Sequence, residues 1–237
     1  MQGLPISFSQ CRHRLAGGRV LTLFTGRLAV AGPVLPAQFE QWVCAADMQR
    51  AGRFRDPVVA GRYLASHVLL NRALAEVLGP GFSPEQVLRD AMGKPYLPGR
   101  PVHFSLSRSD NYTVAAVSRG HPVGVDIETR MDLSIAREVA GRVLGREESE
   151  AWRRLGDTAA LEAFRAIWCL KEAILKVSGE GLSRDPGEIQ LARDAAGWRL
   201  LRLPEGYGDC FEWELGRADP ERGFPGVFYA VKNRPEG

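Results

Sequence analysis

The chain has 237 residues, of which 45% are hydrophobic and 25% are charged, and its formal net charge is +3. This length can bury a substantial core, and so small a net charge gives no argument for nucleic-acid binding. No apolar segment approaches the roughly 20 residues that span a bilayer. Arg12, Arg14 and Arg19 interrupt any apolar stretch at the N-terminus. We therefore expect a cytoplasmic protein without a signal peptide or a membrane span.

The four cysteines are Cys11, Cys44, Cys169 and Cys210, and their spacing forms no CxxC metal or redox pair. Cys169 lies within an apolar helical pattern, which favours a buried reduced thiol. We expect no disulfide framework, because a chain of this length does not need one.

The first half of the chain reads as strand, helices and strands. Residues 19–30 are rich in Val, Leu and Thr and predict a strand, and residues 37–49 and 56–78 predict two helices. Ser83 is the predicted cap of a short third helix, with Pro84 at its first position. Strand-like segments then follow at residues 102–107, 112–118 and 122–127.

The second half repeats this order. Helical periodicity returns at residues 134–144, 147–155 and 158–177. Alternation returns at residues 188–192, 198–203, 211–215 and 227–232. The two runs meet near Gly120. We therefore predict an α+β fold of two halves with a similar plan, residues 1–119 and residues 120–237.

One chemical signal is the segment VGVDIE at residues 123–128. Asp126 and Glu128 are two apart on a predicted strand, so both carboxylates point to one face while Ile127 points to the other. Two like charges this close favour a compensating cation, and Mg²⁺ suits carboxylate oxygens and substrate phosphates. The alternative is a strand that ends in solvent with two acids of no function.

A second signal is WCLKEAILK at residues 168–176, where Trp168, Glu172 and Lys176 share one face of a helix. Glu172 could supply a third acidic metal ligand, and Lys176 could bind a phosphate or protonate a leaving group. The alternative is an exposed Glu–Lys pair that contributes about 0.3–0.5 kcal/mol to the helix.

A third signal is a set of phosphate-binding residue types at loop or strand-end positions. These are Lys94, Ser107, Arg108 and Ser109, with Arg62 on the preceding long helix. Taken one at a time, each is also compatible with a solvated surface side chain.

Taken in order, GKPY at residues 93–96, HFSLSRS at 103–109, VGVDIE and WCLKEAILK resemble the motif series of 4'-phosphopantetheinyl transferases of the surfactin-synthetase (Sfp) type. The resemblance runs from about residue 53 to residue 182. It implies a pseudodimer of two α+β halves with the active site in the cleft between them. The activity implied is transfer of 4'-phosphopantetheine from coenzyme A to a serine of an apo acyl or peptidyl carrier protein, with release of 3',5'-ADP.

The resemblance also implies roles for the residues of the two acidic motifs. Asp126, Glu128 and Glu172 would hold Mg²⁺, or Mn²⁺ in its place, against the coenzyme A diphosphate. Lys176 would assist departure of 3',5'-ADP, and Lys171 would be a second cation near the phosphates or the carrier. The attacking serine needs a base, and the candidates are Glu172, an ionised acid and a metal-associated water.

The nucleotide end of coenzyme A would be held by the third group of residues: Arg62, Lys94, Ser107, Arg108 and Ser109. Two departures from the family pattern bear on this grip. Arg108 stands where the family usually has histidine, and Asp110 where it usually has glycine. Arginine can still bind phosphate through its forked donors, and Asp110 could pair with Arg108.

For the partner, the resemblance implies an acidic, helical carrier protein. Candidate contact regions are residues 137–146 and 179–184, and Glu148 resembles an acidic position near the attacking serine. Chains with both halves usually act as monomers. Two other functions stay open: a coenzyme-binding protein that has lost activity, and a Mg²⁺-dependent diphosphate hydrolase.

Overall fold

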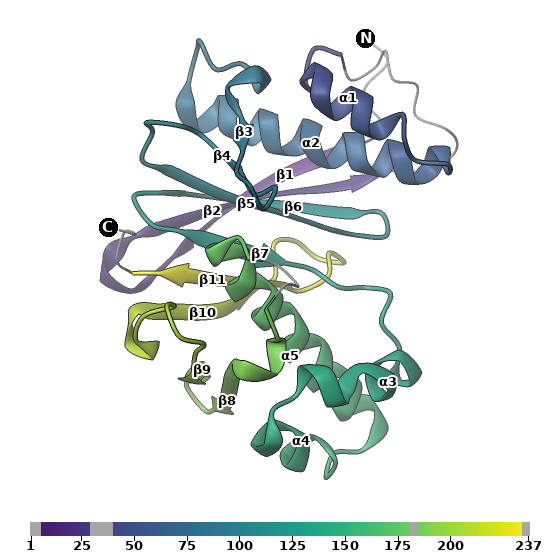
Figure 1. Ribbon diagram of the computed structural model, residues 1–237, viewed down its shortest axis with the longest axis vertical. Helices are drawn as coiled ribbons and strands as arrows, with labels where there is room; N and C mark the ends of the chain where they lie inside the picture. The colour runs from purple at the N-terminus through teal and green to yellow at the C-terminus, as the bar shows by residue number, and fades with distance from the viewer. Residues whose placement is uncertain (1–5, 29–39, 181–183, 234–237) are drawn as a thin grey trace.

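The computed structural model describes residues 6–28, 40–180 and 184–233 (Figure 1). The first half contains, in chain order, β1 (Ile6–Arg14), β2 (Val20–Leu28), α1 (Ala45–Ala51), α2 (Pro57–Leu78), β3 (Leu88–Arg89), β4 (Pro95–Tyr96), β5 (Val102–Ser109) and β6 (Tyr112–Arg119). The second half contains β7 (Val123–Asp126), α3 (Leu133–Val143), α4 (Arg146–Trp152), α5 (Asp157–Ser178), β8 (Gln190–Asp194), β9 (Gly197–Arg202), β10 (Trp213–Ala218) and β11 (Val227–Lys232). The prediction of an α+β fold is confirmed.

Two antiparallel sheets form the centre of the molecule, one with strand order β1-β2-β6-β5 and one with order β10-β11-β7. In the first half, β2 precedes the long helix α2 and pairs with the last strand, β6, which pairs with β5. In the second half, β7 precedes the long helix α5 and pairs with the last strand, β11, which pairs with β10. The orders β2-β6-β5 and β7-β11-β10 therefore correspond. A small two-stranded sheet follows each long helix, β3-β4 after α2 and β8-β9 after α5.

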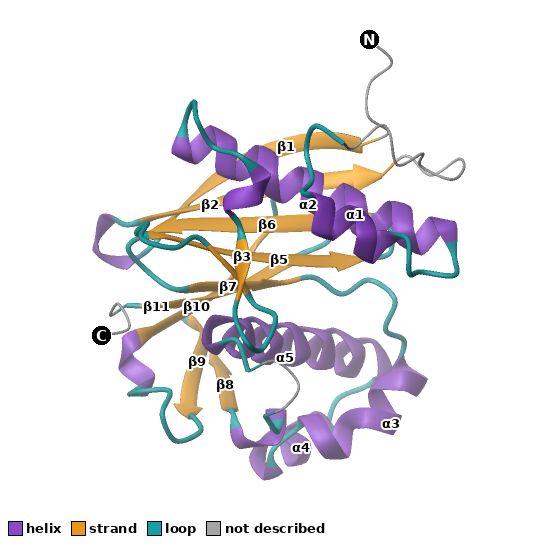
Figure 2. Cartoon of the chain, turned by 45° about the horizontal axis from the view of Figure 1, so that its top comes forward, coloured by secondary structure: helices purple, strands orange, loops and turns teal. Residues whose placement is uncertain are grey.

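The layers stack in the order α2, four-stranded sheet, three-stranded sheet, α5 (Figure 1), and Figure 2 shows α2 lying across the four-stranded sheet. Alternation along each strand produces this arrangement, since neighbouring side chains point to opposite faces. On β2, Leu23 packs between the sheets with Val125 of β7, while Phe24 packs toward Leu69 and Leu70 of α2. Complete burial of each such side chain contributes roughly 1.5–3 kcal/mol.

The two long helices begin and end at residues that favour those boundaries. Asp56 caps α2, with its side chain accepting a hydrogen bond of 2.8 Å from the backbone N–H of Val58, and Pro57 occupies the first turn. Helix α5 ends at Gly179, whose φ of 84° lies in the left-handed region that glycine adopts without strain.

Most predicted elements match the structure to within a few residues, and the differences are at the chain's less regular parts. Strand β1 was not predicted because Arg12 and Arg14 break its apolar pattern. An edge strand can carry such charged side chains, and among the described residues β1 lies at the edge of its sheet, paired with β2. The helix predicted at residues 37–49 is α1, which begins at Ala45; residues 37–39 lie outside the described part of the chain. The short helix after Ser83 is a single 3₁₀ turn with the predicted serine cap.

No helix among the described residues is long and apolar enough to cross a membrane.

Candidate active site

The centre of the site is the contact between β7 and α5. A side chain at Gly124 would not fit there, because a Cβ atom would lie 1.8 Å from the carbonyl oxygen of Ala173. Glycine therefore lets the helix backbone lie directly against the strand. This close approach brings Glu172 and Lys176 of α5 alongside Asp126, the last residue of β7.

Asp126 is buried and its carboxylate accepts two short hydrogen bonds. The Lys176 Nζ and the Ser107 Oγ each lie 2.6 Å from Asp126 Oδ1. Lys176 also donates to the carbonyl oxygen of Val125 at 2.9 Å. These charge-assisted contacts hold the carboxylate and the ammonium in one arrangement.

Glu172 lies beside this pair and lacks a partner for one of its oxygens. Its Oε1 is buried and makes no hydrogen bond with any of the residues that the structure describes. Burial, together with the nearby charge of Asp126, raises the pKa of the Glu172 carboxyl, and Lys176 opposes the rise. An orphaned buried oxygen next to a second carboxylate is the chemistry that a divalent cation would satisfy.

Glu128 lies just beyond the end of β7, where its Oε1 holds the following turn. That oxygen accepts hydrogen bonds from Ser109 Oγ at 3.0 Å and from the backbone N–H groups of Arg130 and Met131. Within the described ranges, no three His, Cys, Asp or Glu side chains are grouped so that they could hold a metal ion. The structure thus brings Asp126 and Glu172 together, and commits Glu128 Oε1 to the turn.

A pocket of about 480 Å³ opens beside Lys176. It takes its walls from both halves of the chain, and five of its residues are basic. The lining residues are Arg50, Phe54, Tyr63, His67, Arg89, Met92, Gly93, Lys94, Pro95, Phe104, Ser105, Leu106, Arg108, Lys176 and Gly179. Because no Asp or Glu contributes to this lining, the pocket favours an anionic ligand.

Arg108 points into this pocket over the aromatic ring of Tyr63. Its guanidinium carbon lies 5.5 Å from the ring centre, and that of Arg50 lies 6.0 Å from it. Partial burial of the guanidinium lowers the pKa of Arg108, although the residue as a whole is exposed. Arg50 is exposed as well, so an anionic ligand can reach both guanidinium groups from solvent.

A buried polar cluster behind the pocket supports Arg89. Asp47 Oδ1 accepts hydrogen bonds from Tyr63 Oη at 2.7 Å and from Arg89 Nη2 at 3.0 Å. Arg89 Nη2 also lies 3.1 Å from His67 Nε2, and since arginine can only donate, His67 carries its proton on Nδ1, facing the Tyr63 carbonyl. Burial lowers the pKa of His67, which favours this neutral form.

Two predicted phosphate ligands already have partners within the protein. Arg62 forms an ion pair of 2.9 Å with Asp110 and a hydrogen bond of 2.8 Å with Asn111 Oδ1, so Asp110 pairs with Arg62 and not with Arg108. Lys94 lines the pocket, and its Nζ donates to the Val177 carbonyl at the end of α5. Arg62 is not among the lining residues of the pocket.

Lys171 does not reach the pocket, although it is adjacent to Glu172 in sequence. Its Nζ is buried and donates to Glu148 Oε2 and to the Val143 carbonyl, both at 2.6 Å. Glu148 also accepts from the backbone N–H groups of Gly145 and Leu191. Lys171 and Glu148 therefore form a buried link between α5, α4 and β8. The resemblance had implied that Lys171 contacts the phosphates or the carrier and that Glu148 lies near the attacking serine.

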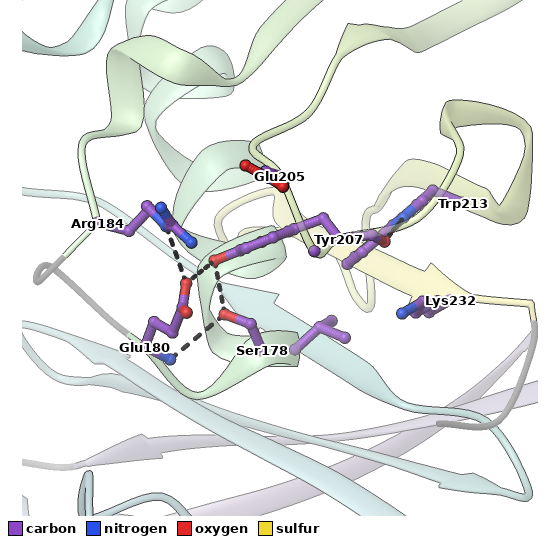
Figure 3. Close-up of a pocket in the computed structure, with 9 residues that line it drawn as sticks. Ser178, Glu180, Arg184, Glu205, Tyr207, Trp213 and Lys232 are labelled. Carbon is purple, nitrogen blue, oxygen red and sulfur yellow. Dashed lines mark hydrogen bonds and ion pairs between the residues drawn. The ribbon is translucent and has the colours of Figure 1, made fainter. Parts of the chain in front are cut away.

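A second pocket of about 320 Å³ lies on another side of the end of α5 (Figure 3). Tyr207 Oη lies 2.7 Å from both Ser178 Oγ and Glu180 Oε2, and Arg184 donates to the same Glu180 oxygen. Burial raises the pKa of Tyr207 to about 12, so it stays a neutral hydrogen-bonding group. Glu180 and Arg184 belong to the predicted carrier-contact region at residues 179–184, whose residues 181–183 lie outside the described ranges.

Sequence reasoning missed several pocket residues, chiefly Arg50, Tyr63, His67 and Arg89. Tyr63 and His67 are four apart on α2, a spacing that equally fits side chains packed on one face of a helix. Arg50 and Arg89 carry no local signal, because they reach the pocket only through the packing of α1 and of the β3-β4 sheet.

Known proteins resemble this chain both in a family model and in individual sequences. The model for the 4'-phosphopantetheinyl transferase superfamily matches residues 122–223, which include Asp126, Glu172 and Lys176. The 4'-phosphopantetheinyl transferase HetI of Nostoc is 32% identical over 171 residues, which are 66% of this chain and 71% of the relative. A 4'-phosphopantetheinyl transferase of Bacillus subtilis is 28% identical over 170 residues, 71% of this chain and 75% of the relative.

The enzyme Sfp of Bacillus subtilis strain 168, also named a 4'-phosphopantetheinyl transferase, is 25% identical over 177 residues, 73% of this chain and 77% of the relative. These matches confirm the resemblance drawn from the four sequence motifs. The chain belongs to the 4'-phosphopantetheinyl transferase superfamily and is a transferase.

Proposed function

We propose that this protein transfers 4'-phosphopantetheine from coenzyme A to a serine of an apo acyl or peptidyl carrier protein, in a Mg²⁺-dependent reaction that releases 3',5'-ADP. The observation that carries the proposal is the meeting of Asp126, Glu172 and Lys176 at the edge of a cationic pocket. Acidic metal ligands beside phosphate-binding cations are what transfer of a phosphoryl-linked group requires.

The proposed site lies in a cleft between two related halves, residues 1–119 and 120–237. The corresponding strand orders β2-β6-β5 and β7-β11-β10, each with a long helix on the outer face, support a pseudodimer. The cationic pocket takes Arg108 and Tyr63 from the first half, and Lys176 and Gly179 from the second. Since one chain supplies both walls, we propose that it acts as a monomer.

The nucleotide end of coenzyme A would occupy the cationic pocket. Its phosphates would face Arg50, Arg89, Lys94 and Arg108, which the pocket presents without an acidic residue in its lining. Arg62 would not contact the nucleotide; it would hold Asp110 and Asn111 in place at the turn between β5 and β6.

Asp126 and Glu172 would hold Mg²⁺, or Mn²⁺ in its place, with Glu128 as the third ligand. The unpartnered Glu172 Oε1 supports this assignment, whereas Glu128 Oε1 already accepts three hydrogen bonds. When bound, the cation would supply positive charge to the coenzyme A diphosphate. Lys171 takes no part in this site, because its Nζ is enclosed by Glu148 and Val143.

In the proposed reaction, the carrier serine Oγ forms a bond to the β-phosphorus of the diphosphate. The bond from that phosphorus to the bridging oxygen breaks, and 3',5'-ADP leaves with the electron pair. Glu172 takes the serine proton, which suits a half-buried carboxylate whose pKa is raised by its surroundings. Lys176 balances the negative charge that develops on the leaving phosphate.

Intact-mass spectrometry of an apo carrier protein, incubated with this protein, coenzyme A and Mg²⁺, tests the proposal. We expect the carrier to gain the mass of one phosphopantetheine, and EDTA or Asp126→Ala to abolish the gain. Coenzyme A binding without a gain on any of several acyl and peptidyl carriers would indicate an inactive binding protein. Release of 3',5'-ADP without a carrier would indicate a hydrolase.

A further inference from the structure

Three serines of β5 connect the two halves of the molecule. Ser105, Ser107 and Ser109 alternate along the strand, so their side chains share one face. No backbone ladder joins β5 to β7 within the described residues, because the two strands belong to different sheets. The serine hydroxyls therefore provide polar links across this seam.

Each serine has a different partner on the second half. Ser105 Oγ accepts a hydrogen bond of 3.1 Å from the backbone N–H of Val125. Ser107 Oγ donates to Asp126 Oδ1 at 2.6 Å, and Ser109 Oγ donates to Glu128 Oε1 at 3.0 Å. The first link holds backbone, whereas the other two hold the carboxylates that we propose as metal ligands.

Ser107 is held at both its side chain and its backbone. Only 7% of the residue is exposed, and its hydroxyl carries a single proton, which it donates to Asp126. Its backbone is held as well, since the Thr113 hydroxyl donates to the Ser107 carbonyl at 3.2 Å.

Arg108, the next residue, points to the opposite side of the strand and lines the cationic pocket. Ser107 therefore contacts the acidic centre, whereas Arg108 lines the cationic pocket. The alternation of the strand explains this division, because consecutive side chains face opposite ways.

We propose that Ser107 is a positioning residue that orients Asp126 for the metal. The inference rests on the proposed function. Together with Lys176, Ser107 fixes Asp126 Oδ1 by two contacts of 2.6 Å. Loss of a hydrogen bond that orients a metal-ligating carboxylate typically weakens metal affinity by roughly 10–100-fold.

The test compares four variants of the full-length protein, Ser107→Ala, Ser107→Thr, Ser105→Ala and Arg108→Ala. One readout needs no turnover: titration of the protein with Mn²⁺ alone, followed by the electron paramagnetic resonance of free Mn²⁺. The other is the division of a rate effect between kcat and KM for coenzyme A, measured on a carrier protein.

We expect Ser107→Ala to weaken Mn²⁺ binding by roughly 10–100-fold and to lower kcat by a larger factor than it raises KM for coenzyme A. Ser107→Thr keeps the hydroxyl and should restore most of the affinity. Ser105→Ala removes a seam hydrogen bond that no carboxylate uses, so it should lower the melting temperature without changing Mn²⁺ affinity. Arg108→Ala should raise KM for coenzyme A and leave Mn²⁺ affinity unchanged.

The inference is overturned if Ser107→Ala binds Mn²⁺ as tightly as the wild type, or if its main effect is a raised KM for coenzyme A. It is equally overturned if the wild type binds no Mn²⁺, or if Ser105→Ala weakens Mn²⁺ binding as much as Ser107→Ala does. Failure of the wild type to modify any carrier, with intact Mn²⁺ binding that depends on Ser107, would instead refute the proposed function and leave the positioning role standing.

Discussion

Two lysines of helix α5 each form an ion pair with a carboxylate of another element at the same distance. One pair is enclosed by protein, and the other borders the cationic pocket. Lys171 Nζ lies 2.6 Å from Glu148, and Lys176 Nζ lies 2.6 Å from Asp126. The side chains of the first pair are 1% and 2% exposed, whereas those of the second are 27% and 8% exposed. Distance alone therefore does not distinguish a structural pair from a pair with a chemical role.

Their hydrogen bonds do distinguish them. In the Lys171–Glu148 pair, both carboxylate oxygens accept backbone N–H groups as well, and the ammonium also reaches the Val143 carbonyl. The Lys176–Asp126 pair borders a cationic pocket and lies beside the unpartnered oxygen of Glu172. Saturated contacts give the first pair no capacity for a ligand, and the second pair retains it.

Removing the enclosed lysine should have the largest effect on stability. Lys171→Met leaves the buried carboxylate of Glu148 without its counter-charge, which should lower the free energy of unfolding by about 3–5 kcal/mol. Urea unfolding monitored by tryptophan fluorescence measures the loss. The double variant Lys171→Met/Glu148→Gln removes the buried charge and keeps an amide oxygen for a backbone N–H group, so it should recover much of the loss. No recovery would show that the missing counter-charge is not the cause.

Removing the lysine at the pocket should act on the rate. Lys176→Met should slow transfer by roughly 10²–10³-fold, as loss of one charge-stabilising donor does in other enzymes. Its free energy of unfolding should fall by less than that of Lys171→Met, because the Lys176 side chain is 27% exposed whereas that of Lys171 is 1% exposed. Steady-state kinetics and urea unfolding on the same preparation check both parts. A Lys176→Met variant that loses as much stability as Lys171→Met and still turns over normally would contradict the comparison.

Arg108 should affect affinity more than rate. Loss of one charged contact to a phosphate costs about 1.5–3 kcal/mol, so Arg108→Ala should raise KM for coenzyme A by roughly 10–100-fold at nearly constant kcat. Arg108→Lys keeps the charge without the fork and should fall between. An unchanged KM in both variants would place Arg108 outside the nucleotide site.

A smaller effect concerns Glu172 and pH. The pKa of this carboxyl in the folded protein lies above its ordinary value of 4.5, first because of burial and then because of Asp126. The protonated form therefore stabilises the fold below the unfolded pKa, and this contribution is lost as pH rises through the folded pKa. Glu172→Gln, which cannot ionise, should gain stability relative to the wild type as pH rises over this range. Urea unfolding in EDTA at several pH values measures the difference, and parallel pH profiles for the two proteins would show that Glu172 is not destabilised by burial.

Much of the acidic centre could be predicted from sequence. The spacing in WCLKEAILK places Glu172 and Lys176 on one helical face, and the glycine at 124 allows that face to meet Asp126. The burial of Lys171 could also be predicted from sequence. Lys171 is four residues after Ile167 and three before Ile174, so it shares their buried face and not that of Glu172.

The residues that line the cationic pocket were harder to predict from sequence. Arg50 and Arg89 are nearly forty residues apart and meet only because α1 and the β3-β4 sheet pack around α2. The alternation along β5 could have separated Ser107 from Arg108, but it could not show that Asp126 lies on the serine side. Contacts set by tertiary packing leave no local pattern in the chain.

A crystal structure with coenzyme A and Mn²⁺, with the metal located by anomalous scattering, tests the division between the two pairs most directly. The account predicts one metal peak bonded to Asp126 and Glu172, the diphosphate beside Lys176, and the nucleotide against Arg108 and Arg89. Lys171 should remain bonded to Glu148. A metal bound away from Asp126, or a nucleotide in the pocket lined by Tyr207 and Trp213, would contradict it.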